Sequence, residues 1–446
     1  MMPGALRFAA WSLAAAALLA GRPARLGATE PWTLDRALEA AFANNPDARI
    51  ARHRMAGAEA MLQQAQADRM PQLSLHASYS QTNSPMAAFG SILNQRAFDS
   101  SLDFNDPGRI DNLNLTGTVA YRLYDGGQTA SGITAARHGV RSNEEGERAT
   151  LHRLGAEVVK AYLNIRKTAE AVTAVEAGVR SYEAAVDAGR ARFDAGRMLK
   201  ADLLSLEVQL AQTREALILA RHETSLAGRS FLFVIGADAS AGSVELAPGD
   251  SALERIRMPV TLDPSPRPEL IALQAAFDAA RARVAAARGE RRPSVNAFAS
   301  YQHDRGWELD EHGSGWIAGV AVDMNIFDGG AISGRIRASE AAMAEAGELL
   351  RRTQLAIGLE IEQAKLAQQQ AVERVSVTAA AIAQAEESAA LSRARFSEGA
   401  LQASELIDVE SRLIGANTRH ILARADERIA LADLRRSVGL PPIEKL

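Results

Sequence analysis

The sequence predicts a mixed α/β membrane protein built from two copies of one unit. In this fold class, short strands pooled from several chains close a β-barrel in the membrane, and very long helices continue that barrel. Three observations lead to it: an internal duplication, four segments that alternate between apolar and polar residues, and two long tracts without proline.

The duplication is visible as two constant offsets between the halves of the chain. One offset, of 203 residues, holds without a net gap over more than a hundred residues, and a second, of 222, holds upstream of it. The clearest matched pairs are Asp125-Gly126-Gly127 with Asp328-Gly329-Gly330, Arg192-Phe193 with Arg395-Phe396, Gly196 with Gly399, Pro46 with Pro268, and Ala77-Ser78-Tyr79 with Ala299-Ser300-Tyr301. The difference of nineteen residues is an insertion in one connection of the first copy. A unit built twice with one variable loop is therefore expected.

The first 28 residues are predicted to be a signal peptide for export. Arg7 supplies the positive start, and residues 8–20 form an apolar core that is too short to span a bilayer. Removing residues 1–28 takes away three arginines and no acids, so the formal net charge falls from −4 to −7. This charge argues against a nucleic-acid partner. The chain has no cysteine, which excludes disulfides and lipid attachment to an N-terminal cysteine.

The first unit begins with two helices and continues with two strands. Thr33 is a plausible cap for a short helix that Asn44-Asn45-Pro46 interrupts, and a second helix is expected from Pro46 to about Asp68. Residues 72–79 and 113–123 alternate with period two, as strands with one apolar face do. The residues between them, 80–111, are rich in Asn, Asp and Ser and are predicted to be a loop.

The second unit supplies two more alternating strands, at residues 295–301 and 318–326, with a shorter loop over residues 303–314. Each of the four strands is about ten residues long, which is the length that spans a bilayer in a tilted barrel. Four strands cannot close a barrel, and lipid does not tolerate an open edge. Three chains would supply twelve strands. The alternative interpretation is a soluble sheet packed on helices.

The helical tracts are the longest elements of the chain. Residues 128–195 and 331–398 contain no proline, and each would form a helix about 100 Å long. In the first copy, a returning helix over residues 198–235 and the earlier helix over 46–68 would nearly match the long helix if stacked end to end. Such lengths favour a tall barrel of helices standing in an aqueous compartment. A plain structural coiled coil would show the same apolar spacing but would not explain the strands.

The order of these motifs resembles that of the TolC family, the outer-membrane efflux proteins of Gram-negative bacteria. In each half a strand ends in an aromatic residue followed by Asp-Gly-Gly, a long helix comes next, and an Arg-Phe-x-x-Gly motif ends that helix. The likeness extends from Thr33 to Pro441. It implies a homotrimer with a twelve-stranded barrel in outer-membrane lipid and a periplasmic α-helical barrel. It also implies two partners, a periplasmic adaptor (membrane fusion) protein and an inner-membrane pump of RND, ABC or MFS type.

The resemblance also assigns roles to individual residues. Acids six and nine residues past the second tip glycine, Glu405 and Asp408, would form a charged ring at the closed aperture, with Asp202 as a further member from the first hairpin. The tip residues that would dock the adaptor are Arg192, Phe193, Gly196, Arg395, Phe396 and Gly399. The strand-to-helix turns are Asp125, Gly126, Gly127, Asp328, Gly329 and Gly330. The chain departs from the family pattern at Leu199, Leu401 and Gln402.

No feature of the sequence favours an enzyme. The eight histidines are scattered, and no phosphate-binding loop or metal-protease motif is present. We therefore expect no catalysis, no cofactor and no metal, although residues 303–312 hold a group of His, Asp and Glu side chains. The prediction is an exit duct of a tripartite efflux or type I secretion system. Its alternatives are a periplasmic adaptor and a structural coiled coil. The expected segments are the signal peptide 1–28, a first repeat 29–236, a linker or equatorial segment 237–267, and a second repeat 268–446.

Overall fold

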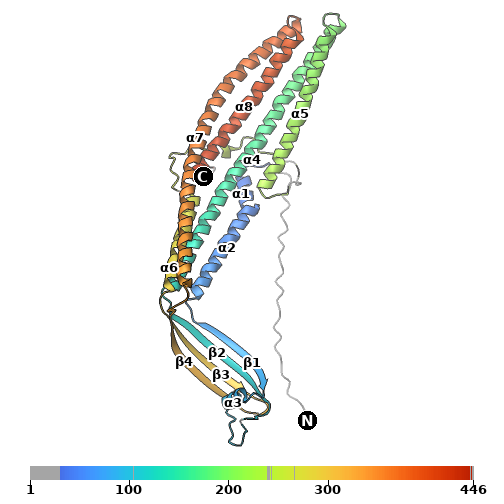
Figure 1. The fold of residues 1–446 in the computed structure, drawn as a ribbon. Helices are drawn as coiled ribbons and strands as arrows, with labels where there is room; N and C mark the ends of the chain where they lie inside the picture. The colour runs from blue at the N-terminus through green and yellow to red at the C-terminus, as the bar shows by residue number, and fades with distance from the viewer. Residues whose placement is uncertain are drawn as a thin grey trace, which may run out of the picture.

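The computed structural model describes residues 31–441 and 443, except 104, 239–241, 243 and 266. The predicted signal peptide, residues 1–28, lies outside the described residues. The molecule is long and thin, with a four-stranded sheet at one end and the tips of two helical hairpins at the other (Figure 1). The predicted mixed α/β fold, with one unit occurring twice, is confirmed.

The sheet joins the two repeats edge to edge. Its strands, β1 (Gln72–Thr82), β2 (Ile110–Tyr124), β3 (Ser294–Arg305) and β4 (His312–Asp323), are antiparallel and lie in sequence order. The junction between the repeats is the β2–β3 pair, in which Thr118 lies opposite Ser300. Alternate side chains form an exposed apolar face that runs across all four strands, and its larger members include Leu73, Leu75, Tyr79, Val119, Tyr121, Tyr301, Trp316 and Val320. Such a face is what a strand presents to lipid.

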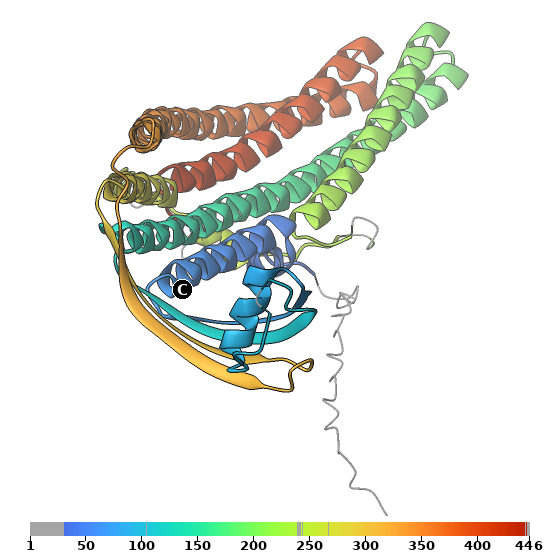
Figure 2. The ribbon, with the colours of Figure 1, turned by 60° about the horizontal axis from the view of Figure 1, so that its bottom comes forward.

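The connection predicted as a loop over residues 80–111 contains a helix, α3 (Pro85–Asn94), which the sequence prediction missed. Ser84 precedes a proline at the first helical position, and the buried Ala88 and Ile92 pack against Ile110 of β2. After the helix, the Gln95 amide donates hydrogen bonds to the Asp111 carbonyl (2.7 Å) and the Asn112 side chain (3.0 Å). These contacts hold α3 on the concave side of the curved sheet (Figure 2).

The second hairpin loop is shorter than the predicted residues 303–314. β3 continues to Arg305 and β4 begins at His312, so only residues 306–311 connect them. The other boundary of β4 was predicted too late. Asp323 pairs with Ser294, the first residue of β3, so Met324 and Ile326 have no strand opposite them and lie beyond the sheet.

Each repeat has one very long helix, a helix that returns from its tip, and an earlier helix that leads into the sheet. The long helices α4 (Gln128–Asp194) and α7 (Ala331–Glu398) have 67 and 68 residues, and the returning helices α5 (Lys200–Val234) and α8 (Ala403–Ser437) have 35 each. The remaining helices are α1 (Leu34–Asn44), α2 (Pro46–Ala67) and α6 (Pro268–Gly289). Among the residues that the structure describes, no helix has both the length and the apolar character needed to cross a membrane.

In each repeat the early helix and the returning helix stack end to end, α2 on α5 and α6 on α8, as their lengths predict. The Asn45 side chain donates to the carbonyl of Val234, the last residue of α5 (2.8 Å), and accepts a hydrogen bond from the Asp47 N–H (2.8 Å). It thus caps α2 and ends α5 at the same point. In the second repeat Arg267 donates to the carbonyl of Ser437, at the end of α8 (3.1 Å). Both stacked pairs lie alongside the long helices (Figure 1).

The main apolar core lies at the level of these junctions. Trp32, Tyr162 and Phe231 are buried there, with their rings in edge contacts 5.6 and 6.4 Å apart. The segment between the repeats packs on this core through a short 3₁₀ helix, η1 (Ser251–Arg255). Its Asp250 accepts hydrogen bonds from the Leu34 N–H (2.7 Å) and the Tyr162 hydroxyl (2.8 Å). Burial and this carboxylate raise the pKa of Tyr162 far above its usual range.

Candidate functional site at the hairpin tips

The two hairpin tips lie at the end of the molecule farthest from the sheet (Figure 1). Gly196 and Gly399 adopt φ angles of 69° and 85°, which only glycine reaches without strain, and each follows the end of a long helix. The closing hydrogen bonds are equivalent. The Arg192 carbonyl accepts from the Arg197 N–H (2.8 Å), and the Arg395 carbonyl accepts from the Ala400 N–H (2.9 Å). The predicted tip residues therefore shape both turns.

The tips nevertheless differ in how their phenylalanines are covered. Phe396 is 3% exposed because it packs in the apolar cluster of the tips and the Arg192 guanidinium lies over its ring, 4.6 Å from the centroid. Arg192 also donates a hydrogen bond to the Phe396 carbonyl. Phe193 is 37% exposed. The identical Arg-Phe motifs gave no sign of this difference. In the isolated chain, Phe193 is open to a partner and Phe396 is not.

The three acids predicted for the aperture lie just past the tips. Asp202 is in the first turn of α5 and Glu405 is in the first turn of α8, where the positive end of the helix favours a carboxylate. Asp408 follows Glu405 by three residues, so the two lie on one face of α8, and both are exposed. Asp408 forms an ion pair with Arg412 (2.6 Å). The acids of the second hairpin are thus adjacent to one another and accessible.

Beneath the second tip, α8 is held against α7 by an ion pair whose carboxylate is buried. Glu410 is 1% exposed and accepts two hydrogen bonds from Arg393 of α7, one of them 2.8 Å long. The hydrogen bond with Glu410 raises the pKa of Arg393. Across from it, the buried Tyr182 of α4 donates to the Ile407 carbonyl (3.0 Å). These residues were not predicted from the sequence, although the offset of 203 maps Arg190 onto Arg393 and Glu207 onto Glu410 and could have found that pair.

The departure from the family pattern at Leu401 has a structural explanation. Leu401 is half-buried and packs against the apolar cluster of the tips, which includes Tyr182, Leu206, Phe396 and Leu406. An apolar side chain is therefore suited to this position. Leu199 is 71% exposed at the start of α5, and Gln402 is exposed at the start of α8.

The Asp-Gly-Gly turns join the sheet to the long helices. Asp125 accepts hydrogen bonds from the N–H groups of Gly127 (3.0 Å) and Thr129 (2.7 Å), and Asp328 accepts from those of Gly330 (2.9 Å) and Ile332 (2.7 Å). Each aspartate thereby caps the start of a long helix. Burial disfavours the charged form of Asp125, but these bonds and one from the Thr129 hydroxyl outweigh it and lower its pKa.

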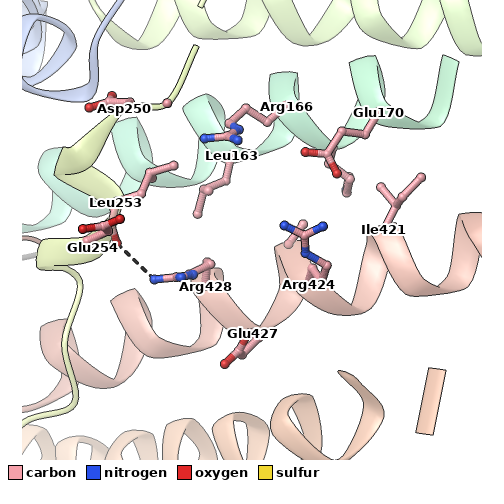
Figure 3. Close-up of a pocket in the computed structure, with 13 residues that line it drawn as sticks. Leu163, Arg166, Glu170, Asp250, Leu253, Glu254, Ile421, Arg424, Glu427 and Arg428 are labelled. Carbon is pink, nitrogen blue, oxygen red and sulfur yellow. Dashed lines mark hydrogen bonds between the residues drawn. The ribbon is translucent and has the colours of Figure 1, made fainter. Parts of the chain in front are cut away.

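A charged groove lies far from the tips, between α4, α8 and the segment that contains Asp250 (Figure 3). It has a volume of about 300 Å³, and Arg428 donates to the Leu253 carbonyl at its edge (3.1 Å). Its other charged residues are of both signs: Arg166, Lys167, Arg424, Glu170, Glu254 and Glu427. Small-molecule sites are mostly apolar, so this groove does not resemble one.

The group of acids and histidines at residues 303–312 does not form a metal centre. Asp304 is buried and accepts hydrogen bonds from the side chains of Asn112 (2.7 Å) and Asn114 (2.9 Å). His303 is hydrogen-bonded to the Ser314 hydroxyl (3.0 Å). Within the described part of the chain, no three His, Asp or Glu side chains are placed to hold a metal ion.

Comparison with known proteins identifies the family. The family described as "Outer membrane efflux protein" matches residues 37–236 and 265–440, most of both repeats. The chain belongs to this family. Its members include the TolC-like channels, and the predicted resemblance is therefore confirmed. The protein is an outer membrane channel protein of a non-enzymatic family whose channels assemble as trimers.

Individual relatives agree with this assignment. The chain is 27% identical to the outer membrane efflux protein BepC of Brucella suis over 240 residues, 52% of each chain. It is also 27% identical to the protein CyaE of Bordetella pertussis over 333 residues, which are 72% of this chain and 69% of CyaE. The match thus spans about half the length of BepC and about two thirds of CyaE.

The solved structure of the outer membrane protein VceC from Vibrio cholerae has the same fold. Its TM-score is 0.77 at 19% identity, and the likeness covers 91% of this chain and 96% of VceC. Neither a periplasmic adaptor nor a coiled coil alone explains the sheet, the two hairpins and this match together. Both alternatives are therefore set aside.

Proposed function

We propose that three copies of this chain form the outer-membrane exit duct of a tripartite efflux or type I secretion system. Three sheets would close the twelve-stranded barrel in the outer membrane, and the hairpins would form a periplasmic tunnel. The observation that carries the proposal is the placement of exposed acids at the hairpin tips. The helix α4, about 100 Å long, separates these tips from the sheet with its exposed apolar face.

The partners of the duct would be a periplasmic adaptor and an inner-membrane pump of RND, ABC or MFS type. The hairpin tips would contact the adaptor, since the turn residues Gly196 and Gly399 are exposed at the far end of the helices. The pump would supply the energy, because a family of channels without enzymatic activity supplies none.

Glu405, Asp408 and Asp202 would control which ions pass the tips. A trimer presents each carboxylate three times around one axis, and a ring of like charges at a constriction concentrates ions of the opposite sign. Asp408 and Glu405 would contribute most, because both are exposed and adjacent on α8. Asp202 is half-buried and would contribute less.

Single-channel recording in a planar bilayer tests this function. The wild-type channel should prefer cations, and Glu405→Gln combined with Asp408→Asn should lower the cation-to-anion permeability ratio by roughly tenfold. The loss of Asp408 also leaves Arg412 unpaired, which adds to the effect. Asp202→Asn alone should cause a smaller change. Glu427→Gln, in the groove far from the tips, is the matched control and should leave selectivity unchanged.

Two results would count against the proposal. If the Glu405→Gln/Asp408→Asn variant conducts with unaltered selectivity, these acids do not form a selective ring at the tips, although the proposed duct function stands. If the protein is fully released from membranes without detergent and gives no conductance, the proposed duct function itself is wrong.

A further inference from the structure

One contact ties the two hairpins of a chain together at their tips. Arg192, near the end of α4, covers the ring of Phe396 near the end of α7 and donates to its carbonyl. A guanidinium over an aromatic face is attracted by the electrons of the ring, and a cation also suits the negative end of a helix. We refer to this pair, Arg192 with Phe396, as the tip clasp.

Each hairpin has an arginine and a phenylalanine that could form the clasp. Within the chain, only the arginine of the first hairpin and the phenylalanine of the second are used. The offset of 203 maps Arg192 onto Arg395 and Phe193 onto Phe396. Phe193 is 37% exposed, and the exposed Arg395 side chain has no hydrogen bond, ion pair or aromatic contact in the described part of the chain. Among the described residues, Phe193 and Arg395 therefore form no contact of the kind that joins Arg192 to Phe396.

The helix below the tip shows the same asymmetry. The ion pair of Arg190 with Glu207 (2.7 Å) in the first hairpin is equivalent to that of Arg393 with Glu410 in the second. The Glu410 side chain is 1% exposed, and α4 packs beside this part of α8 through Tyr182. The equivalent Glu207 side chain on α5 is 37% exposed.

Apolar side chains on α5 follow this pattern too. Ile407 of α8 packs against the apolar cluster of the tips, whereas its equivalent on α5, Leu204, is 48% exposed. Val208, one turn further along α5, is 56% exposed. The face of α5 that stays open thus corresponds to the face of α8 that the first hairpin covers within the chain.

We propose that the second hairpin of another copy of this chain covers this open face, and that its Arg395 holds Phe193 as Arg192 holds Phe396. The inference rests on the trimer of the proposed function. A ring of three chains then contains six tip clasps, three within chains and three between them. In each, an arginine covers a phenylalanine ring and donates to its carbonyl at the end of a long helix. The tips thereby approach sixfold geometry although the assembly has threefold symmetry.

Cross-linking in outer-membrane preparations tests the proposal, because the chain contains no cysteine of its own. Arg395→Cys with Phe193→Cys, treated with a short bis-maleimide, should shift the protein on a denaturing gel from one-chain to two- and three-chain species. Arg192→Cys with Phe396→Cys is the matched control. Its cross-link lies within one chain, so it should give no multi-chain species, and proteolysis should show the two peptides joined.

A register control separates a specific contact from mere proximity. Ala394→Cys with Phe193→Cys moves the thiol by one residue, to another face of α7, and should give several-fold less multi-chain product. A benzophenone side chain at position 193, with Arg395 intact, gives an independent reading if the cysteine variants fail to fold. It should label the peptide that contains Arg395 in a neighbouring chain.

The outcomes that overturn the clasp differ from those that overturn the duct. If light scattering shows a trimer but position 193 does not cross-link to position 395, or does so no better than to position 394, the trimer stands and the clasp is wrong. If position 193 cross-links to an adaptor instead, the proposal that a second copy of this chain covers Phe193 is wrong. If the protein is a monomer in detergent, both the clasp and the trimeric duct are wrong.

Discussion

Replacing Gly126 by alanine is expected to destabilise the protein by about 3 kcal/mol, the sum of a strained backbone and a steric clash. Gly126 has a φ of 70°, a conformation that side chains disfavour. A Cβ added there would lie 2.4 Å from the carbonyl oxygen of Gly289, the last residue of α6, and 2.8 Å from the Arg292 Cβ. Because α6 belongs to the second repeat, the substitution would push the two repeats apart at the level where sheet becomes helix.

The second repeat provides a matched control at Gly329. It has the same backbone conformation, with φ of 65°, but a Cβ there would meet no atom of the chain within 4 Å. Gly329→Ala should therefore cost only about 1 kcal/mol.

Thermal unfolding of the detergent-solubilised protein, followed by circular dichroism, measures both variants under identical conditions. The contact with α6 predicts a clearly lower melting temperature for Gly126→Ala than for Gly329→Ala. Equal melting temperatures would show that the strained backbone alone determines the loss, and that the packing of the two repeats at this turn contributes nothing.

Much of the fold could be predicted because its boundaries depend on local chemistry. An aspartate before two glycines predicts a turn that caps the next helix, and Asp125 and Asp328 cap the long helices in this way. The absence of proline let both long helices be predicted to within a residue of their ends. The helix α3 was missed because its ten residues have few apolar contacts of their own and depend on β2 for packing and on Gln95 for anchoring.

The site could be predicted less fully than the fold, for a reason visible in the two Arg-Phe motifs. Both motifs predict the same turn, and both tips have it. The environment of each phenylalanine, however, depends on which helix lies next to it in space. Phe396 has Arg192 as a neighbour, whereas Phe193 stays more than a third exposed within the chain. A repeat in sequence therefore specifies local shape, whereas contacts between repeats depend on the assembly.

Replacing Arg267 by alanine is expected to cost about 3 kcal/mol, since it removes a buried cation that pairs with two partly buried carboxylates. The Arg267 side chain is 4% exposed and forms ion pairs with Glu269 (3.0 Å) and Glu360 (2.5 Å). It also donates to the Ser437 carbonyl, which ties the end of α8 to the start of α6. In the first repeat the uncharged Asn45 makes the equivalent hydrogen bond, to the carbonyl at the end of α5, and forms no ion pair. The loss should be visible as a lower melting temperature of the helices.

The dependence on pH shows whether the lost ion pairs cause this loss of stability. Burial disfavours the charged form of Glu269, but Arg267 outweighs it and lowers the pKa of this carboxyl. A lowered pKa stabilises the folded chain above the ordinary pKa of glutamate, and that contribution is lost as the pH falls through the lowered value. The difference in stability between wild type and Arg267→Ala should therefore narrow below about pH 4.

A second substitution separates charge from packing at this junction. Glu360→Gln removes one of the carboxylates that Arg267→Ala leaves behind, so the double variant should recover part of the lost stability. Recovery is expected to be incomplete, because Glu360 also pairs with Arg436 and because the hydrogen bond to Ser437 stays broken. If the double variant is no more stable than Arg267→Ala, and the difference from wild type does not narrow in acid, the arginine acts through packing and its bond to α8. The ion pairs would then contribute little to holding the second repeat together.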